Sequence, residues 1–498
     1  MSLHHLYVVL LAGGLVLLVS IVATRVATGI GLPSLLLFLG VGVAVGEDGL
    51  GLQFDNAQLA QTLGTVALAV ILVEGGLTTR FADIRDVLRP AGVLATVGVG
   101  VSTLVTAAGA HLLVGLDWQF ALLLGAIVSS TDAAAVFSVL RVLPLPRRLV
   151  GLLEAESGFN DAPAVILVLL FSTIPFTVTP GHVTVSLLYQ LVVGAAIGLA
   201  CGLLGALALR RIALPASGLY PLAIFALGMV AFAVAGSADA SGFIAAYLAG
   251  LVLANSGLSH RSATRSFAEG VGWLAQIGLF VLLGMLVSPD ELPADVVPAI
   301  VVGVVLLLLS RPLAVVVSLA AFRVPWREQA FLSWAGLRGA IPIVLATYPL
   351  VEDVPGSQRL FNIVFILVVV FTLVQGPSLR LTARLLGLNP RDPTREIQVE
   401  SAPLDMMEAE LLTMTVSPGS RLYDVSILEL RLPEPSVITL IIRDDQPLVP
   451  GPATRIEVGD ALLIVTTPKT REAVERRMRA VSRRGRLAYW FGEYGLPD

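Results

Sequence analysis

The sequence contains little cysteine, lysine or charge of any kind. Its 498 residues include one cysteine, Cys201, which excludes an internal disulfide and a thiolate metal site. Lys469 is its one lysine. Charged residues make up 14% of the chain and hydrophobic residues 56%, with a mean hydropathy of +0.87. Soluble domains of this length do not have such a composition, so we expect a polytopic membrane protein.

Apolar runs recur through the first 386 residues. A helix needs about 20 such residues to cross about 30 Å of hydrocarbon, and on this basis we expect about thirteen membrane-spanning helices. They are expected near residues 6–24, 31–46, 59–78, 90–114, 118–140, 149–173, 184–209, 217–235, 241–256, 268–287, 296–321, 328–350 and 360–385.

Every second loop between these spans is basic, and the others are acidic or neutral. By the positive-inside rule the basic loops face the cytoplasm. We therefore expect a multi-pass protein of the cell (inner) membrane with its N-terminus outside and its C-terminus in the cytoplasm. The basic loops contain Arg25; Arg80, Arg85 and Arg89; Arg141, Arg147 and Arg148; Arg210 and Arg211; Arg261 and Arg265; and Arg323 and Arg327.

The composition changes after residue 386, and we divide the chain there. Residues 1–386 form a transmembrane domain, 387–402 a proline-bearing linker, 403–480 a small α+β domain, and 481–498 a basic and aromatic tail. Short β-rich runs separated by turn residues predict the strands of the small domain. Helices are expected over 420–430, with Ser420 as N-cap, and over 470–481.

Three ionisable residues share one depth, near the middle of their spans. They are Asp132, Asp161 and Arg338. Polar residues precede Asp132, whereas Gly339 and Pro342 follow Arg338, so both spans are expected to be broken helices. The two spans run in opposite directions. This pattern predicts an inverted-repeat transporter with its site at the midplane, although the halves have no clear sequence identity.

Helical spacing divides the polar residues of the sixth span between two faces. Ser157 and Asp161 lie four residues apart on one face, and Glu156 and Asn160 lie on the next. Asp161, Asp132, Ser157 and carbonyl groups near Thr131 could bind a dehydrated monovalent cation. Because a carboxylate removed from water favours its protonated form, protons and cations can compete for the same group.

Several of these residues also allow a purely structural interpretation. Glu156 and Arg338 are expected to form a structural ion pair, and Asp132 could instead cap a broken helix. Glu74 is either a boundary residue or part of a cation funnel. Arg311 is expected to satisfy buried carbonyls or a carboxylate.

The motifs "EGGLTTR", "SSTD", "ESGFND" and "GLRGAIPI" together resemble the electroneutral branch of the bacterial monovalent cation/proton antiporters, over about residues 5–386. The resemblance implies a homodimer with a rigid dimer domain and a moving core, formed by spans four to six and eleven to thirteen. It implies that Asp161 carries cation and proton in turn, that Asp132 and Ser157 line the cation site, and that Thr131 contributes its main chain. It also implies the structural pair of Glu156 and Arg338, with Asn160 standing where electrogenic relatives have a second aspartate.

The C-terminal domain resembles the TrkA-C module of potassium-conductance regulators, over "LYDVSILELRLPEPSVITLIIRDDQPLVPGPATRIEVGDALLIV". The usual Arg-Asp-Gly turn is here "RDDQ", and no Gly-rich βαβ unit precedes the module. We therefore expect no NAD-type cofactor. The resemblance implies that a small regulatory ligand, such as a cyclic dinucleotide, binds residues 403–480.

Together these features predict a transporter that exchanges K+ or Na+ for H+ by electroneutral alternating access, regulated by its cytoplasmic domain and serving pH homeostasis. Potassium is favoured because the tail module belongs to potassium proteins. The alternatives are a Na+-selective exchanger, a regulated cation channel, which the midplane carboxylates argue against, and a membrane enzyme. No Ser/His or metal-ligand cluster occurs in the spans, so we expect no enzyme, no metal other than the monovalent cation, and no nucleic-acid partner.

Overall fold

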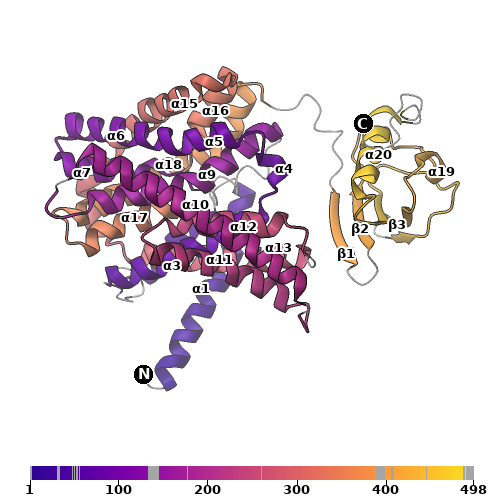
Figure 1. The fold of residues 1–498 in the computed structure, drawn as a ribbon, viewed down its shortest axis with the longest axis horizontal. Coiled ribbons are helices and arrows are strands. Elements are labelled where there is room, and N and C mark those ends of the chain that lie inside the picture. The colour runs from indigo at the N-terminus through magenta and orange to yellow at the C-terminus, as the bar shows by residue number, and fades with distance from the viewer. Residues whose placement is uncertain are drawn as a thin grey trace. The chain divides into compact units, whose positions relative to one another are not determined.

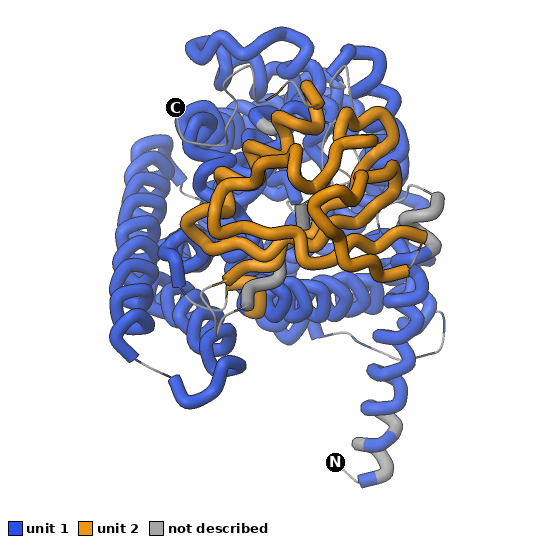
Figure 2. Tube along the Cα trace, turned by 90° about the vertical axis from the view of Figure 1, so that its right-hand side faces the viewer, with its two compact units in different colours: residues 1–258, 264–389 blue, residues 259–263, 390–498 orange. Residues whose placement is uncertain are grey.

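The chain forms two compact units in a computed structural model. One unit consists of residues 1–258 and 264–389, and the other of residues 390–498 with 259–263 (Figure 2). The structure describes residues 3–30, 34–47, 49, 51, 54, 56–132, 145–176, 178–212, 214–258, 261–388, 399–404, 409–444, 446–485 and 488. Residues 133–140 of the predicted fifth span, most of the predicted linker and most of the predicted tail lie outside these residues.

The described residues of the first unit form helices joined by turns and short loops (Figure 1). Its helices are α1 (Leu3–Ile30), α2 (Ser34–Val45), α3 (Ala57–Thr78), α4 (Phe81–Ile84), α5 (Leu88–Val93), α6 (Val99–Val114), α7 (Trp118–Ser129), α9 (Arg147–Phe171), α10 (Pro180–Arg211), α11 (Leu219–Ser237), α12 (Gly242–Asn255), α13 (Arg261–Met285), α14 (Val296–Val305), α15 (Arg311–Leu319), α16 (Trp326–Trp334), α17 (Ala340–Val351) and α18 (Ser357–Leu385).

Each predicted span overlaps one of these helices or a consecutive pair of them. By length and apolar composition alone, seven helical stretches of the described chain could cross a membrane, and the shorter apolar helices include α2, α7, α12 and α17. The expectation of a multi-pass helical membrane protein is therefore confirmed. The figure of about thirteen crossings stays a prediction.

The interruptions of the helices occur in corresponding places in the two predicted halves. A π-helical segment, Leu94–Gly98, joins α5 to α6, and a second, Leu306–Ser310, joins α14 to α15. The predicted twelfth span is broken between α16 and α17, and α7 ends at Ser129 before a non-helical stretch. Irregular backbone of this kind is tolerated at membrane depth where it is buried in protein. These positions support the predicted inverted repeat.

Glycines bring α12 into close contact with two neighbouring helices. A Cβ atom added to Gly198 of α10 would lie 2.6 Å from the carbonyl oxygen of Ala245, and one added to Gly76 of α3 would lie 2.3 Å from that of Tyr247. Small residues allow such backbone approach between membrane helices. The backbone of α12 is thus fixed on both sides.

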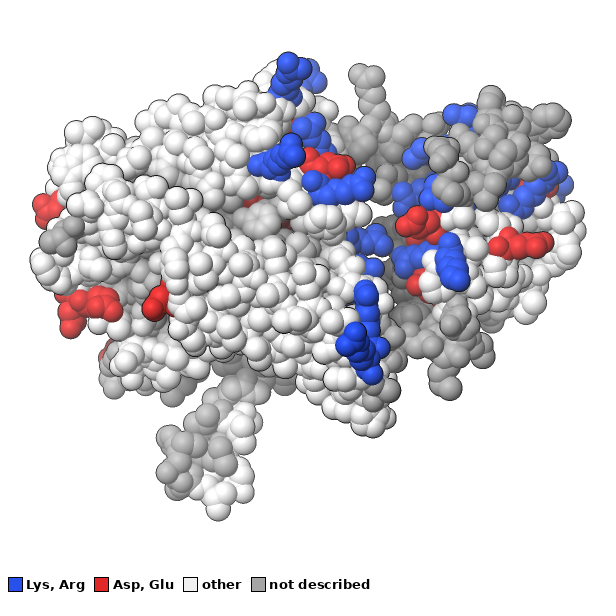
Figure 3. Space-filling view, viewed as in Figure 1, with Lys and Arg blue, Asp and Glu red and all other residues white. Residues whose placement is uncertain are grey.

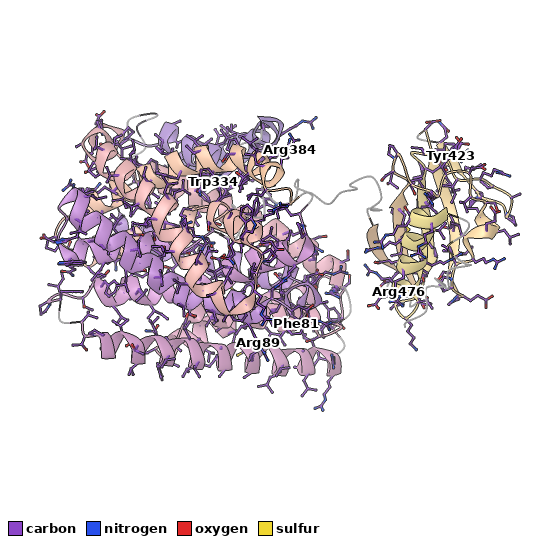
Figure 4. The ribbon with its side chains drawn as sticks, turned by 90° about the horizontal axis from the view of Figure 1, so that it is seen from above. Phe81, Arg89, Trp334, Arg384, Tyr423 and Arg476 are labelled. Carbon is purple, nitrogen blue, oxygen red and sulfur yellow. The ribbon has the colours of Figure 1, made fainter. Side chains whose placement is uncertain are left out.

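Charged side chains are unevenly distributed over the helical unit. On the face drawn in Figure 3, arginine side chains gather at one end of this unit, and acidic side chains are seen at the opposite end. Arg384, in the last turn of α18, and Phe81, at the start of α4, lie toward the same end (Figure 4). This separation agrees with the predicted alternation of basic loops.

The second unit contains a five-stranded antiparallel sheet in the order β1-β2-β5-β3-β4 and a helix, α20 (Arg471–Arg484). Alternate residues of the strands, such as Leu462 and Ile464, are buried in one cluster with Val474 and Met478 of α20. The strands are β1 (Val399–Leu404), β2 (Ala409–Thr415), β3 (Val437–Arg443), β4 (Gln446–Leu448) and β5 (Ala461–Thr466).

Two local expectations about this unit are wrong. Strand β1 begins inside the predicted linker 387–402, because an edge strand needs only its pairing with β2 and tolerates the proline at position 403. The predicted helix over 420–430 is limited to α19 (Ile427–Leu430), whose N-cap is Ser426. Ser426 and Glu429 form a reciprocal capping box, whereas the hydroxyl of Ser420 lies 2.8 Å from that of Ser482.

Candidate functional site

Asp161 is buried near the middle of α9 and is hydrogen-bonded to Ser130. Its Oδ1 atom accepts a hydrogen bond of 2.6 Å from the hydroxyl of Ser130, and its side chain is 3% exposed. Its Oδ2 atom has no hydrogen-bond partner among the described residues, and no ion pair of Asp161 occurs there. A buried carboxylate oxygen without a partner is costly, so this atom is available for a proton or a cation.

The end of α7 brings polar groups against the same part of α9. Beyond Ser129 the chain is non-helical, with Ser130 in an extended conformation. The amide of Asn160 donates to the Thr131 hydroxyl at 2.6 Å, and that hydroxyl lies 3.1 Å from the hydroxyl of Ser157. Because Thr131 accepts from Asn160, its own proton can be donated to Ser157. Asn160 thus orients the two hydroxyls beside Asp161.

Asp132 links the non-helical stretch after α7 to the break between α16 and α17. Its Oδ2 atom accepts a hydrogen bond of 2.8 Å from the backbone N–H of Ala340, the first residue of α17, and its own N–H donates to the carbonyl of Leu337 at 3.0 Å. A carboxylate at this position stabilises a helix N-terminus. Asp132 also lines the cavity described below, so capping and cation binding are compatible roles.

Glu156 pairs with Arg311, and the predicted pairing with Arg338 is wrong. Both Glu156 oxygens accept hydrogen bonds from the guanidinium of Arg311, with 2.8 Å for the Nη2–Oε2 contact. Arg338 instead lies in the break between α16 and α17. There it donates through Nε to the carbonyl of Val128 at 3.0 Å and through Nη1 to the carbonyl of Gly336.

Arg338 bonds to backbone carbonyl groups because the helix breaks leave several of these groups without a partner in their own helix. Val128 lies in the last turn of α7, whose carbonyls have no partner within the helix. The guanidinium of Arg338 satisfies one of them, so Glu156 pairs with the second buried arginine. The membrane depth expected from the sequence could not distinguish Arg311 from Arg338 as the partner of Glu156, because both arginines lie near the middle of their predicted spans.

A cavity of about 270 Å³ opens beside Asp161, and we call it the carboxylate-lined cavity. Five acidic residues of the described chain line it, and Glu74 of α3 is one of them. The Arg265 guanidinium on its wall donates to Glu269 at 3.0 Å. Within the described residues, no group of three or more His, Cys, Asp or Glu could hold a metal ion. The acidic lining residues are Glu74, Asp132, Glu154, Asp161 and Glu269, and Tyr247 lines the same cavity.

Three of the residues around Asp161 were missed by the sequence reasoning. Ser130, which bonds Asp161, was noted only as a residue next to a helix break. Glu154 lies seven residues before Asp161, so two turns of helical spacing could have indicated its shared face. Tyr247 lies in an apolar span far away in the sequence, and nothing in its neighbours distinguishes it.

Comparison with known families identifies both parts of the chain. The family model described as sodium/hydrogen exchanger, transmembrane, matches residues 15–385. The TrkA-C domain model matches residues 411–479. These ranges lie within the parts predicted to be a transmembrane domain and a TrkA-C-type domain.

Individual relatives match over most of their length. The K(+)/H(+) antiporter NhaP2 of Shewanella baltica is 36% identical over 493 residues, which cover 97% of this chain and 85% of the relative. The K(+)/H(+) antiporter NhaP of Alkalimonas amylolytica is 37% identical over 461 residues, covering 91% of this chain and 80% of the relative. The sodium proton antiporter MjNhaP1 of Methanocaldococcus jannaschii has the same fold, with a TM-score of 0.65 and 21% identity over 77% of this chain and 99% of that chain. The chain therefore belongs to the sodium/hydrogen exchanger family of cation/proton antiporters and is a multi-pass membrane protein with a C-terminal TrkA-C domain.

Proposed function

We propose that this protein exchanges K+ for H+ across the cell membrane and that Asp161 carries the two ions in turn. The observation that carries the proposal is the buried carboxylate of Asp161, which borders the carboxylate-lined cavity and has one oxygen without a partner. A cation or a proton satisfies that oxygen. The protein alternates between inward-facing and outward-facing states only when Asp161 has bound a cation or a proton. Because the empty protein does not make this change, the two ions must be exchanged.

Oxygen atoms around Asp161 provide the remaining cation ligands. Asp132 lines the same cavity, and the hydroxyl of Ser157 projects from the same face of α9. The main chain at Thr131, in the non-helical stretch after α7, adds a carbonyl. Asn160 orients the hydroxyls of Thr131 and Ser157 and cannot itself ionise.

The charges around Asp161 support electroneutral exchange. Two arginines and three carboxylates are buried around Asp161, the Asp161 carboxylate included. When all five are ionised, they carry one excess negative charge. A single monovalent cation or a single proton neutralises it, and burial strongly disfavours any other charge state. One cation then exchanges for one proton. The residues counted are Arg311, Arg338, Asp132, Glu156 and Asp161.

Potassium is the proposed cation. The relatives that match more than nine-tenths of the chain carry K(+)/H(+) in their names, with 36–37% identity. The Na(+)/H(+) antiporter NhaS2 of a Synechocystis strain is 28% identical over 72% of the chain. The TrkA-C domain adds a module associated with potassium proteins.

The remaining features of the proposal concern topology, assembly and regulation. The alternation of basic loops supports a C-terminus in the cytoplasm and an N-terminus outside, in the inner membrane of a bacterial cell. The protein acts as a homodimer in pH homeostasis. The TrkA-C domain binds a small ligand of the cyclic dinucleotide class, with no cofactor in the transport step, and biases the exchanger by its different affinity for two conformations.

A vesicle assay tests this proposal. Purified protein in liposomes with an internal pH dye is exposed in turn to K+, Na+, Li+ and Rb+ at equal concentration. The proposal predicts cation-dependent proton movement that is largest with K+ and no cation flux without a counter-moving proton. Passive K+ conductance would instead favour the channel alternative, and a larger response to Na+ would favour the Na+-selective exchanger.

A further inference from the structure

Tyr247 has a buried hydroxyl without a hydrogen-bond partner among the residues that the structure describes. The side chain is 2% exposed, and its hydroxyl makes no hydrogen bond within the described part of the chain. Its polar neighbours are Thr79 and Glu154. The Thr79 hydroxyl donates its proton to the carbonyl of Gly75 at 2.6 Å, so it cannot also donate to the phenol oxygen, whose lone pairs remain available. Native proteins rarely leave such a group unpaired, so the Tyr247 hydroxyl calls for an explanation.

Tyr247 lines the carboxylate-lined cavity, together with Asp161 and Glu154. These two acidic residues lie two helical turns apart on α9. Gly158, between them, faces the tyrosine ring: a Cβ atom added there would lie 2.7 Å from two ring carbons and 3.1 Å from the hydroxyl oxygen. The phenol is therefore held beside α9, one turn before Asp161.

The position of Tyr247 is fixed by contacts with α3 and α9. Its carbonyl oxygen is in close contact with Gly76 of α3. Its ring packs edge-to-face on Phe159, with 5.4 Å between the ring centroids. The aromatic contacts hold the ring, while the hydroxyl remains without a partner. A group that is positioned in this way and left unsatisfied is suited to a transient ligand.

We propose that Tyr247 is a positioning residue for the transported cation. Its hydroxyl oxygen holds the cation, or a water molecule of the cation's hydration shell, as the cation moves between Glu154 and Asp161. A phenolic oxygen can accept from water or coordinate a cation with its lone pairs, while its proton is donated to a carboxylate. The inference rests on the proposed exchange at Asp161 and adds a residue from α12, a helix that carries none of the groups assigned to ion binding.

The test removes the hydroxyl and keeps the ring. Tyr247→Phe and wild-type protein are compared in the vesicle assay over a range of K+ concentrations. We expect the K+ concentration for half-maximal exchange to rise about three- to tenfold, the equivalent of one lost hydrogen bond, while the maximal rate stays within about twofold. The stabilisation of the detergent-solubilised protein by K+, measured as a Tm shift, should weaken in parallel.

Tyr348→Phe is the matched control. The Tyr348 hydroxyl lies 3.1 Å from that of Thr65 and does not line the carboxylate-lined cavity, so its removal should leave the K+ dependence unchanged. A wild-type K+ dependence in a folded Tyr247→Phe protein would overturn the inference, as would an equal shift in the control. Absence of exchange in the wild-type protein would instead refute the proposed function itself.

Discussion

Glu156 and Arg311 link α9 to α15 through two parallel hydrogen bonds between a carboxylate and a guanidinium, and both side chains are almost fully buried. The bidentate geometry is the strongest form of this pair. Arg311 also donates to the carbonyl of Leu332 in α16 at 3.3 Å. The pair therefore ties together three helices that surround the site, and it neutralises a charge that would otherwise be isolated.

Removing one partner of this pair should destabilise the protein more than it changes cation affinity. Glu156→Gln or Arg311→Met leaves an unpaired buried charge, which costs about 3–5 kcal/mol of unfolding free energy. The double variant should recover much of this loss. Thermal unfolding in detergent measures the coupling energy in a double-mutant cycle.

The same cycle with Arg338 distinguishes the two arginines. Arg338→Met should also lower stability, because the carbonyl of Val128 loses its donor, but its coupling to Glu156→Gln should be smaller than that of Arg311. A larger coupling between Glu156 and Arg338 would restore the pairing predicted from the sequence.

Gly339 lies against Asp132 where the broken segments cross. A Cβ atom at position 339 would lie 1.9 Å from the Asp132 carboxylate, so Gly339→Ala must displace the cap on α17. We predict loss of most exchange activity, together with a lower Tm. Gly278→Ala is the control, because a Cβ atom there meets nothing within 4 Å and its activity should be normal. Normal exchange in Gly339→Ala would mean that the contact between Asp132 and Ala340 is dispensable.

The sequence was sufficient to predict elements governed by local chemistry. Apolar length placed the helices, and the four-residue spacing of Ser157 and Asp161 indicated that both lie on one face of α9. Gly339 and Pro342 marked the break in the predicted twelfth span, which the structure has between α16 and α17. Each of these features depends on a few neighbouring residues, which is why pattern alone could find them.

Contacts between distant residues could not be predicted in this way. The choice of Arg311 over Arg338 depends on which unpaired carbonyls the folded helices present, and the importance of Tyr247 depends on its packing against Gly158. Strand β1 was missed because its polar sequence has no apolar alternation, and its conformation comes from pairing with β2.

Exchange should be insensitive to membrane potential. With Asn160 unable to ionise and a single excess negative charge in the site, one cation replaces one proton and no net charge moves. An imposed potential should leave the rate unchanged at fixed ion gradients, as followed by the pH dye. Clear voltage dependence would imply that a second carboxylate, such as Asp132, also changes its protonation during the cycle.

Asn160→Asp should alter this behaviour. An ionised aspartate cannot donate to Thr131, so the hydroxyls of Thr131 and Ser157 lose their fixed orientation, and the site gains a negative charge. We expect weaker exchange at low K+ concentration or a new dependence on potential, measured in the same vesicles. A variant identical to wild type in both properties would contradict the role assigned to Asn160.

Removal of the C-terminal unit should leave exchange active but change its regulation. All residues assigned to the site precede Leu388, and the two units are separately compact. Truncation after Leu388 should therefore shift the pH or K+ dependence, which is measured against full-length protein. Identical profiles would argue against a regulatory role, and complete loss of activity in a folded truncation would make the unit part of the transport machinery.

The most direct test of the account is proton movement by Asp161→Asn in K+-loaded vesicles. The amide keeps the size of the side chain and can still interact with Ser130, but it can neither ionise nor exchange a proton for a cation. Asp295→Asn is the control, because Asp295 is a buried carboxylate that pairs with Arg359 at 2.9 Å and does not line the carboxylate-lined cavity. We predict that Asp161→Asn reaches normal expression with no K+-dependent proton flux, while Asp295→Asn remains active. Exchange at the wild-type rate in Asp161→Asn would contradict the account.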